Sequence, residues 1–249
     1  MLLPIPAPVL GEFFGTLTLI LLGDGVVAGV LLNRSKAHSA GWIVITAGWA
    51  FAVTCGIFVS KALGGLGALN PVGPLADMVL QQMPPVDGLA LVAAQMVGAF
   101  VGAVLVWLHY LPHWQVTKEQ DLKLAVFCTA PAIRSPLSNL LGEFIGTFAL
   151  VFIASAVGKV TKTGDGLNVV GGLEPPLIGL VVWAIGLSLG GTTGYAINPA
   201  RDLAPRLAHF LLPIAGKGSS DWSYAWIPVA GPILGGVIGA FAFKLLTAG

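Results

Sequence analysis

The chain has 249 residues, of which 56% are hydrophobic and only 9% are charged. Soluble globular domains carry roughly a quarter charged residues, so this composition excludes an ordinary water-soluble fold. The net charge of +1 comes from a few scattered Lys and Arg residues without a basic stripe, and nucleic acid is not expected as a partner. The composition predicts an integral membrane protein surrounded by a lipid bilayer.

Apolar runs predict six transmembrane helices, each close to the roughly 20 residues that cross a bilayer. In chain order they cover residues 8–32, 41–64, 89–111, 137–158, 175–190 and 224–246. Six crossings place both termini on the same side. The Lys and Arg residues lie in loops of both sides and do not settle which side this is.

Two further segments, 70–81 and 198–212, are too short to span and begin with Asn-Pro. Short apolar segments of this kind are typical of re-entrant structure. Proline suits the first position of a helix, because its missing N–H would have had no partner there. Each Asn-Pro therefore predicts the start of a half-helix.

The two halves of the chain repeat. Residues 12–16 (EFFGT) return as 143–147 (EFIGT), and residues 68–71 (ALNP) return as 196–199 (AINP). Each half, about 8–112 and 137–246, holds three spans and one half-helix. Because three is odd, the second half enters the membrane from the opposite side. We expect one all-α domain over 1–249, with six spans and two half-helices in an inverted repeat.

Backbone that leaves a helix at membrane depth is tolerated where it lines a polar cavity. Two half-helices that begin there would direct their partly positive N-termini at that cavity and repel cations. Asn70 and Asn198 would add amide donors, while Pro71 and Pro199 would fix the turns. The pattern predicts a passive pathway for neutral solutes that carry hydroxyl oxygens.

Residues 194–202 (GYAINPARD) are the most specific motif of the chain. With the two EF-x-GT segments, they resemble the aquaporin superfamily, or major intrinsic proteins, and its glycerol-facilitator branch. The resemblance implies a right-handed helical bundle with one pore per subunit, a homotetramer, and a plasma (inner) membrane location with cytoplasmic termini. It also implies glycerol and water as solutes, without a cofactor.

The first Asn-Pro motif departs from the family pattern. Residues 67–74 read GALNPVGP where relatives usually have AHLNPAVT. Ala68 thus replaces His and Val72 replaces Ala, while Pro74 remains in a first helical turn, where proline is tolerated. The half-helix should survive, although the replacements bear on permeation.

The resemblance also implies a selectivity filter composed of Trp49, Gly186, Tyr195 and Arg201. The two aromatic residues would form an apolar corner for a carbon backbone, and Arg201 would donate to hydroxyl oxygens. Gly186 would leave room where water-selective relatives have His. This set favours a polyol.

Four other acidic residues lie in or beside apolar segments, where an unpaired carboxylate is costly. Glu12 and Glu143 occupy equivalent repeat positions and are expected to accept hydrogen bonds from loop backbone near the half-helices. Asp202 is expected to brace the loop around Arg201. Asp24 is unusual because the second repeat has Ser155 there; we expect it to be buried with a hydrogen-bond partner.

Several alternatives remain at this point. Within the channel class, the solute could be urea, undissociated lactic acid, ammonia or a metalloid acid. Inverted repeats with broken helices also occur in secondary transporters, but few midplane carboxylates are available for a coupling ion. An enzyme is not expected, because no nucleophile with a base is evident. Neither metal-site spacing nor a disulfide between Cys55 and Cys128 is indicated.

Overall fold

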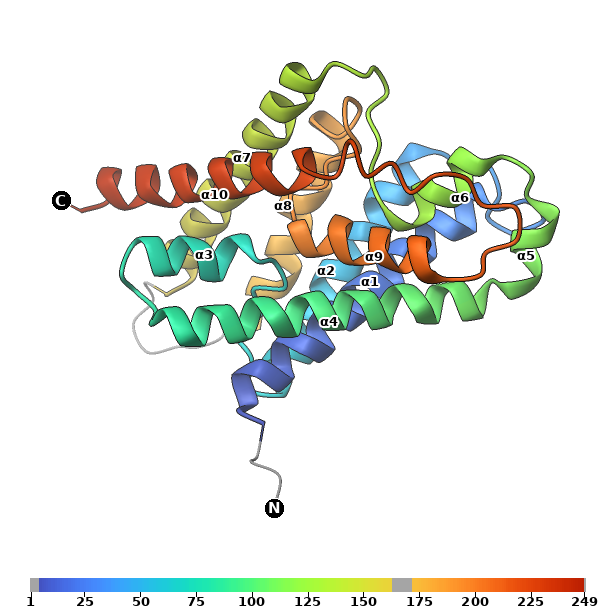
Figure 1. Cartoon of the computed structure of the whole chain (residues 1–249). Coiled ribbons are helices and arrows are strands. Elements are labelled where there is room, and N and C mark those ends of the chain that lie inside the picture. The colour runs from blue at the N-terminus through green and yellow to red at the C-terminus, as the bar shows by residue number, and fades with distance from the viewer. Residues whose placement is uncertain (1–4, 163–171, 249) are drawn as a thin grey trace.

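The computed structural model describes residues 5–162 and 172–248. Over these ranges the chain forms ten α-helices and no strand, which confirms the all-α prediction (Figure 1). The helices are α1 (Ala7–Leu31), α2 (Trp42–Ala62), α3 (Val72–Val79), α4 (Pro85–His109), α5 (Leu111–Val116), α6 (Gln120–Phe127), α7 (Pro136–Lys162), α8 (Glu174–Ser188), α9 (Pro199–Leu211) and α10 (Ile227–Leu246).

Among the described residues, five helices are long and apolar enough to cross a membrane: α1, α2, α4, α7 and α10. The sixth predicted span corresponds to α8, which has 15 residues. At 1.5 Å per residue its helical part is about 22 Å long, shorter than a hydrocarbon core of about 30 Å. Non-helical backbone follows it and continues to Asn198, where α9 begins.

The two predicted half-helices are α3 and α9. They lie between α4 and α10, with their N-terminal ends facing each other near the centre of the molecule (Figure 1). Pro199 is the first residue of α9, whereas Pro71 immediately precedes α3 with helical backbone angles. Pro74 lies in the first turn of α3 without disrupting it.

The same close packing of helices occurs in both halves. On α4, a Cβ added at Gly98 would lie 2.2 Å from the carbonyl oxygen of Phe13 in α1. On α10, a Cβ added at Gly235 would lie 2.2 Å from the carbonyl oxygen of Phe144 in α7. Phe13 and Phe144 belong to the two EF-x-GT segments, so the sequence repeat is also a repeat of backbone contact.

The connection between α4 and α7 has more structure than the sequence indicated. It contains the short helices α5 and α6, and α6 packs against α1 and α9. Cys128 is buried at the C-terminal end of α6, and both Cys55 and Cys128 are free.

Glu12 of α1 holds the loop that leads into α3. Its carboxylate is fully buried and accepts five hydrogen bonds of 2.7–3.0 Å. The donors are the backbone N–H groups of Gly67, Ala68 and Leu69 and the side chains of Ser60 and Gln95. Leu69 has a left-handed φ of +52°, an unfavourable angle for a residue with a side chain. The carboxylate stabilises this strained turn.

Glu143 of α7 does the same for the loop that leads into α9. Its two oxygens accept from the N–H groups of Ala196 at 2.9 Å and Ile197 at 2.8 Å. Ile197 also has a positive φ, of +44°. Both half-helices are therefore introduced by a strained residue whose N–H is bound to a buried carboxylate from the first span of its own half.

Val72, one of the departures in the first motif, fits against a glycine of α10. A Cβ added at Gly236 would lie 2.0 Å from the Val72 Cγ1 atom. This is far below any normal carbon–carbon contact, so a larger residue at 236 would displace the valine. The larger side chain at position 72 is thus matched by the absence of one at 236.

We expect Gly236→Ala to lower the melting temperature of the detergent-solubilised protein, because the added methyl group overpacks the contact with Val72 by about 1–3 kcal/mol. Gly236→Ala with Val72→Ala should restore most of the loss. Gly25→Ala on α1 is the matched control, since nothing lies within 4 Å of its added Cβ. Equal melting temperatures for the Gly236→Ala and Gly25→Ala variants would contradict this account.

Glu12→Gln should also lower the melting temperature, by an amount corresponding to about 1–3 kcal/mol. Both carboxylate oxygens face donors only, so the amide NH₂ of glutamine would oppose another N–H group. Glu119→Gln, at an exposed site, should change little. Thermal unfolding followed by size-exclusion chromatography measures the difference, and a Glu12→Gln variant as stable as Glu119→Gln would disprove the acceptor role.

Candidate functional site

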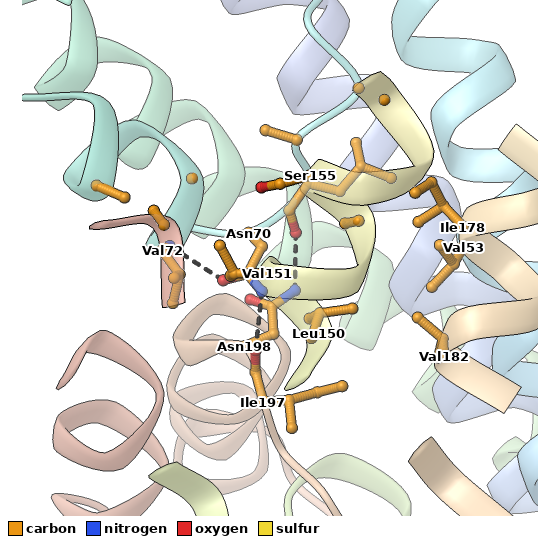
Figure 2. Close-up of a pocket in the computed structure, with 18 of the residues that line it drawn as sticks. Val53, Asn70, Val72, Leu150, Val151, Ser155, Ile178, Val182, Ile197 and Asn198 are labelled. Atoms are coloured by element: carbon orange, nitrogen blue, oxygen red, sulfur yellow. Dashed lines mark hydrogen bonds between the residues drawn. The ribbon is translucent and has the colours of Figure 1, made fainter. Parts of the chain in front are cut away.

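The two Asn-Pro loops are joined by a reciprocal pair of hydrogen bonds. The side-chain Nδ2 of Asn70 donates to the carbonyl of Ile197 at 2.8 Å, and Nδ2 of Asn198 donates to the carbonyl of Leu69 at 2.8 Å (Figure 2). Each asparagine therefore satisfies the carbonyl that precedes the other. The pair fixes the N-termini of α3 and α9 next to each other inside the protein.

The asparagine side-chain oxygens point back to their own half-helices. Oδ1 of Asn198 accepts from the N–H groups of Ala200 at 2.9 Å and Arg201 at 3.3 Å. Oδ1 of Asn70 accepts from the N–H of Val72 at 3.1 Å. Because capping uses the oxygen and the opposite loop uses one N–H, each amide keeps a second N–H for another acceptor.

Both asparagines line a cavity of about 630 Å³. Figure 2 shows Asn70 and Asn198 on one side of it, with Val53, Ile178 and Val182 on the other. One wall thus carries the two amides, beside Val72 and Val151, and the opposite wall is aliphatic. A solute with hydroxyl groups on one edge and carbon on the other matches both walls.

Charged residues lie at one end of this cavity. Lys61 of α2 and Glu174 of α8 form an ion pair there, and Lys244 of α10 also lines this part. The other end is lined by Trp49, Tyr195 and Arg201. The cavity thus connects the charged mouth, the asparagine pair and the predicted filter.

Arg201 and Trp49, two of the predicted filter residues, are stacked. The guanidinium carbon lies 4.1 Å from the centre of the Trp49 ring. Nη1 of Arg201 is 3.4 Å from the carbonyl oxygen of Phe127 and 3.5 Å from Oδ1 of Asp24. The guanidinium is therefore held by an aromatic face and two oxygens while still lining the cavity.

Gly186 and Tyr195 form a second contact pair. A Cβ added at Gly186 would lie 2.8 Å from Cζ of Tyr195, so any side chain at 186 would displace the tyrosine ring. Trp42 supports the same pair, because its indole N–H donates to the Gly186 carbonyl at 3.1 Å and its ring packs edge-on against Tyr195. Gly186 contacts the tyrosine rather than the cavity itself. A side chain at 186 would therefore act on the cavity through Tyr195, which lines it.

Asp202 acts on the segment after α6 rather than on Arg201 directly. Its Oδ2 accepts from the backbone N–H and the hydroxyl of Thr129, both at 2.7 Å, and its Oδ1 accepts from Nε of Arg206 at 2.9 Å. Arg206 in turn donates to the Thr129 carbonyl at 2.9 Å. This network fixes the segment that presents the Phe127 carbonyl to Arg201.

Several contributors had little or no signal in the sequence. The Phe127 carbonyl is backbone, and no residue type marks it. The sequence also gave no sign of the partners of Gln95, which donates to Glu12, or of Arg206, which donates to Asp202. Asp24 was noticeable as a charge in an apolar run, but its pairing with Arg201 was not. Among the described residues, no group of three His, Cys, Asp or Glu side chains could hold a metal.

Comparisons with known proteins agree with this geometry. The chain matches the family model "Major intrinsic protein" over residues 5–243. It is 52% identical to "Glycerol uptake facilitator protein 3" of Lactiplantibacillus plantarum, with 98% of each chain covered. It is also 52% identical to the "Probable glycerol uptake facilitator protein" of Thermotoga maritima, over 95% of this chain and 98% of the other.

Among solved structures, the aquaglyceroporin from Plasmodium falciparum superposes with a TM-score of 0.83 at 27% sequence identity, covering 97% of both chains. The apolar helices, the joined Asn-Pro loops and these matches lead to one assignment. The chain is a multi-pass integral membrane protein that belongs to the major intrinsic protein family.

Proposed function

We propose that this protein is a passive channel through which glycerol and water diffuse down their gradients. The observation that carries the proposal is the cavity with one amide wall and one aliphatic wall at the meeting point of the two half-helices. Glycerol has hydroxyl groups that can accept from Asn70 and Asn198, and a carbon backbone that can lie against Val53 and Val182. Water needs only the hydrogen bonds that the amide wall offers.

Trp49, Gly186, Tyr195 and Arg201 are proposed to form the selectivity filter. Arg201 supplies donors to hydroxyl oxygens at the end of the cavity, and the aromatic rings supply an apolar surface. The lack of a side chain at Gly186 lets Tyr195 lie back against α8. This arrangement favours a polyol over a solute as small as water.

Ions and protons are proposed to be excluded. The N-terminal ends of α3 and α9 face each other at the asparagine pair, and the N-terminal end of a helix carries partial positive charge. Protons and metal cations are repelled at such a point. No step of this function requires catalysis or a cofactor.

We further propose six crossings in a plasma (inner) membrane, with both termini in the cytoplasm, and assembly as a homotetramer. Support comes from the family resemblance and from large apolar side chains on the outer faces of α7 and α10. Those faces expose Leu137, Leu141 and Ile145 on α7 and Leu234, Ile238 and Phe241 on α10. They suit contact with lipid or with neighbouring subunits.

Stopped-flow light scattering on proteoliposomes tests the function. Water and glycerol should permeate much faster than through protein-free vesicles, while planar-bilayer recording should show no cation or proton current. Urea and undissociated lactic acid should be slower than glycerol. Faster flux of either would assign the channel to that solute instead, and flux that depends on an ion gradient would indicate a secondary transporter.

The filter is tested by Gly186→His with Tyr195→Ala. The histidine needs the space that Tyr195 occupies, and the pair of substitutions narrows one wall while it removes the apolar corner. The glycerol-to-water permeability ratio should fall by about tenfold or more, the size of a discrimination worth about 1.4 kcal/mol. If the ratio is unchanged at matched protein density, these residues do not form the constriction.

A further inference from the structure

Asp24 is a buried carboxylate in the middle of α1 that the channel function described above does not require. Its side chain is fully buried, and it does not line the solute cavity. Oδ1 lies 3.5 Å from Nη1 of Arg201, and among the described residues no group donates to Oδ2. A charge at this depth is costly and marks a functional position by default.

The carboxylate approaches Arg201 from the protein side. Arg201 lines the cavity, whereas Asp24 does not, so the ion pair draws the guanidinium away from the lumen. On that side the guanidinium lies over the Trp49 ring, with its carbon 4.1 Å from the ring centre. No solute fits between two groups this close, and the open path must lie beside the stacked pair.

Adjacent residues of α1 support both members of the stack. A Cβ added at Gly23 would lie 2.2 Å from Cζ3 of Trp49, so the indole ring lies directly on the α1 backbone at this glycine. The next residue, Asp24, contacts the arginine. One Gly-Asp dipeptide therefore places the ring and the guanidinium that stacks on it.

The fold itself does not require a carboxylate at this position. The second repeat has Ser155 at the equivalent place, on α7, which packs against α10 as α1 packs against α4. Ser155 lines the solute cavity, whereas Asp24 does not. A buried pair joined by one contact of 3.5 Å contributes little stability, because desolvation offsets the attraction. The geometry points instead to a role in placing Arg201.

We propose that Asp24 is a positioning residue for solute selectivity. It holds the Arg201 guanidinium against Trp49 and offsets its charge, which keeps the constriction wide enough for a carbon backbone. The inference rests on the proposed channel function and adds to it the residue that sets the position of the arginine. Without the carboxylate, the guanidinium is free to move into the lumen, where it obstructs wide solutes more than water.

The test compares Asp24→Asn and Asp24→Ser with the wild-type protein in proteoliposomes. Both variants should fold, because Arg201 lines the cavity and remains solvated when its partner is removed. The probes are water, glycerol and erythritol, in order of width. We expect the glycerol-to-water permeability ratio to fall by about three- to tenfold, the range for the loss of one ordinary hydrogen bond. The permeability to erythritol should fall more than the permeability to glycerol.

Asp87→Asn is the charge-matched control. Asp87 is exposed in the first turn of α4 and does not line the cavity. Its substitution should leave the permeabilities to water, glycerol and erythritol unchanged. Asp24 variants with the same ratios as Asp87→Asn would overturn the proposal. A uniform loss of all three fluxes would also overturn it, because a purely structural defect reduces the number of working channels without changing selectivity.

A double-mutant comparison shows whether Asp24 acts through Arg201. Arg201→Ala and Asp24→Asn/Arg201→Ala should have the same permeability ratios, since no guanidinium remains to be placed. Different ratios in that background would mean that Asp24 affects solutes by another route, contrary to the proposal. A wild-type protein without glycerol flux would overturn the channel function first, whereas normal wild-type flux with unchanged Asp24 variants would overturn this inference alone.

Discussion

The structure depends on a single constraint: backbone N–H and C=O groups that leave a helix inside a membrane must find partners within the protein. The two Asn-Pro loops create many such groups at the centre of the bundle. Asn70 and Asn198 each donate to a carbonyl of the opposite loop. Glu12 and Glu143 accept from the backbone N–H groups of the residues just before these asparagines. With these partners in place, two helices can begin at membrane depth and leave a polar surface there.

The chemistry of the cavity follows from how those partners are used. Each asparagine oxygen caps its own half-helix and each amide gives one N–H to the other loop, so donors remain for a solute while the acceptors are largely occupied. Opposite the asparagine pair, spans α2 and α8 contribute aliphatic side chains, including Val53 and Val182. The pathway therefore has hydrogen-bond donors on one side and an apolar surface on the other. This combination favours neutral solutes with hydroxyl oxygens over cations.

Much of the architecture could be predicted because the sequence repeats. Glu12 and Glu143 share a motif, and a costly buried carboxylate at equivalent positions implied backbone donors nearby, which both have. The reduced length of α8 was less predictable, since an apolar run does not show where helical hydrogen bonding stops. The short helices α5 and α6 were missed as well. Their places are fixed by tertiary contacts such as Thr129 with Asp202, and these pair residues far apart in the chain.

Val72 departs from the family pattern and Asp24 departs from the internal repeat, and each lies against a specific neighbour. Val72 is larger than the usual alanine and lies against Gly236, so packing against α10 accommodates the added volume, although Val72 also lines the cavity. Asp24 differs in kind: its neighbour is a charged residue that lines the cavity, and a change there alters the field and the position of that residue. The larger side chain at position 72 is compensated by the missing side chain of Gly236. The carboxylate of Asp24 is buried on the protein side, where the dielectric constant is low, so its effect extends to Arg201 in the proposed filter.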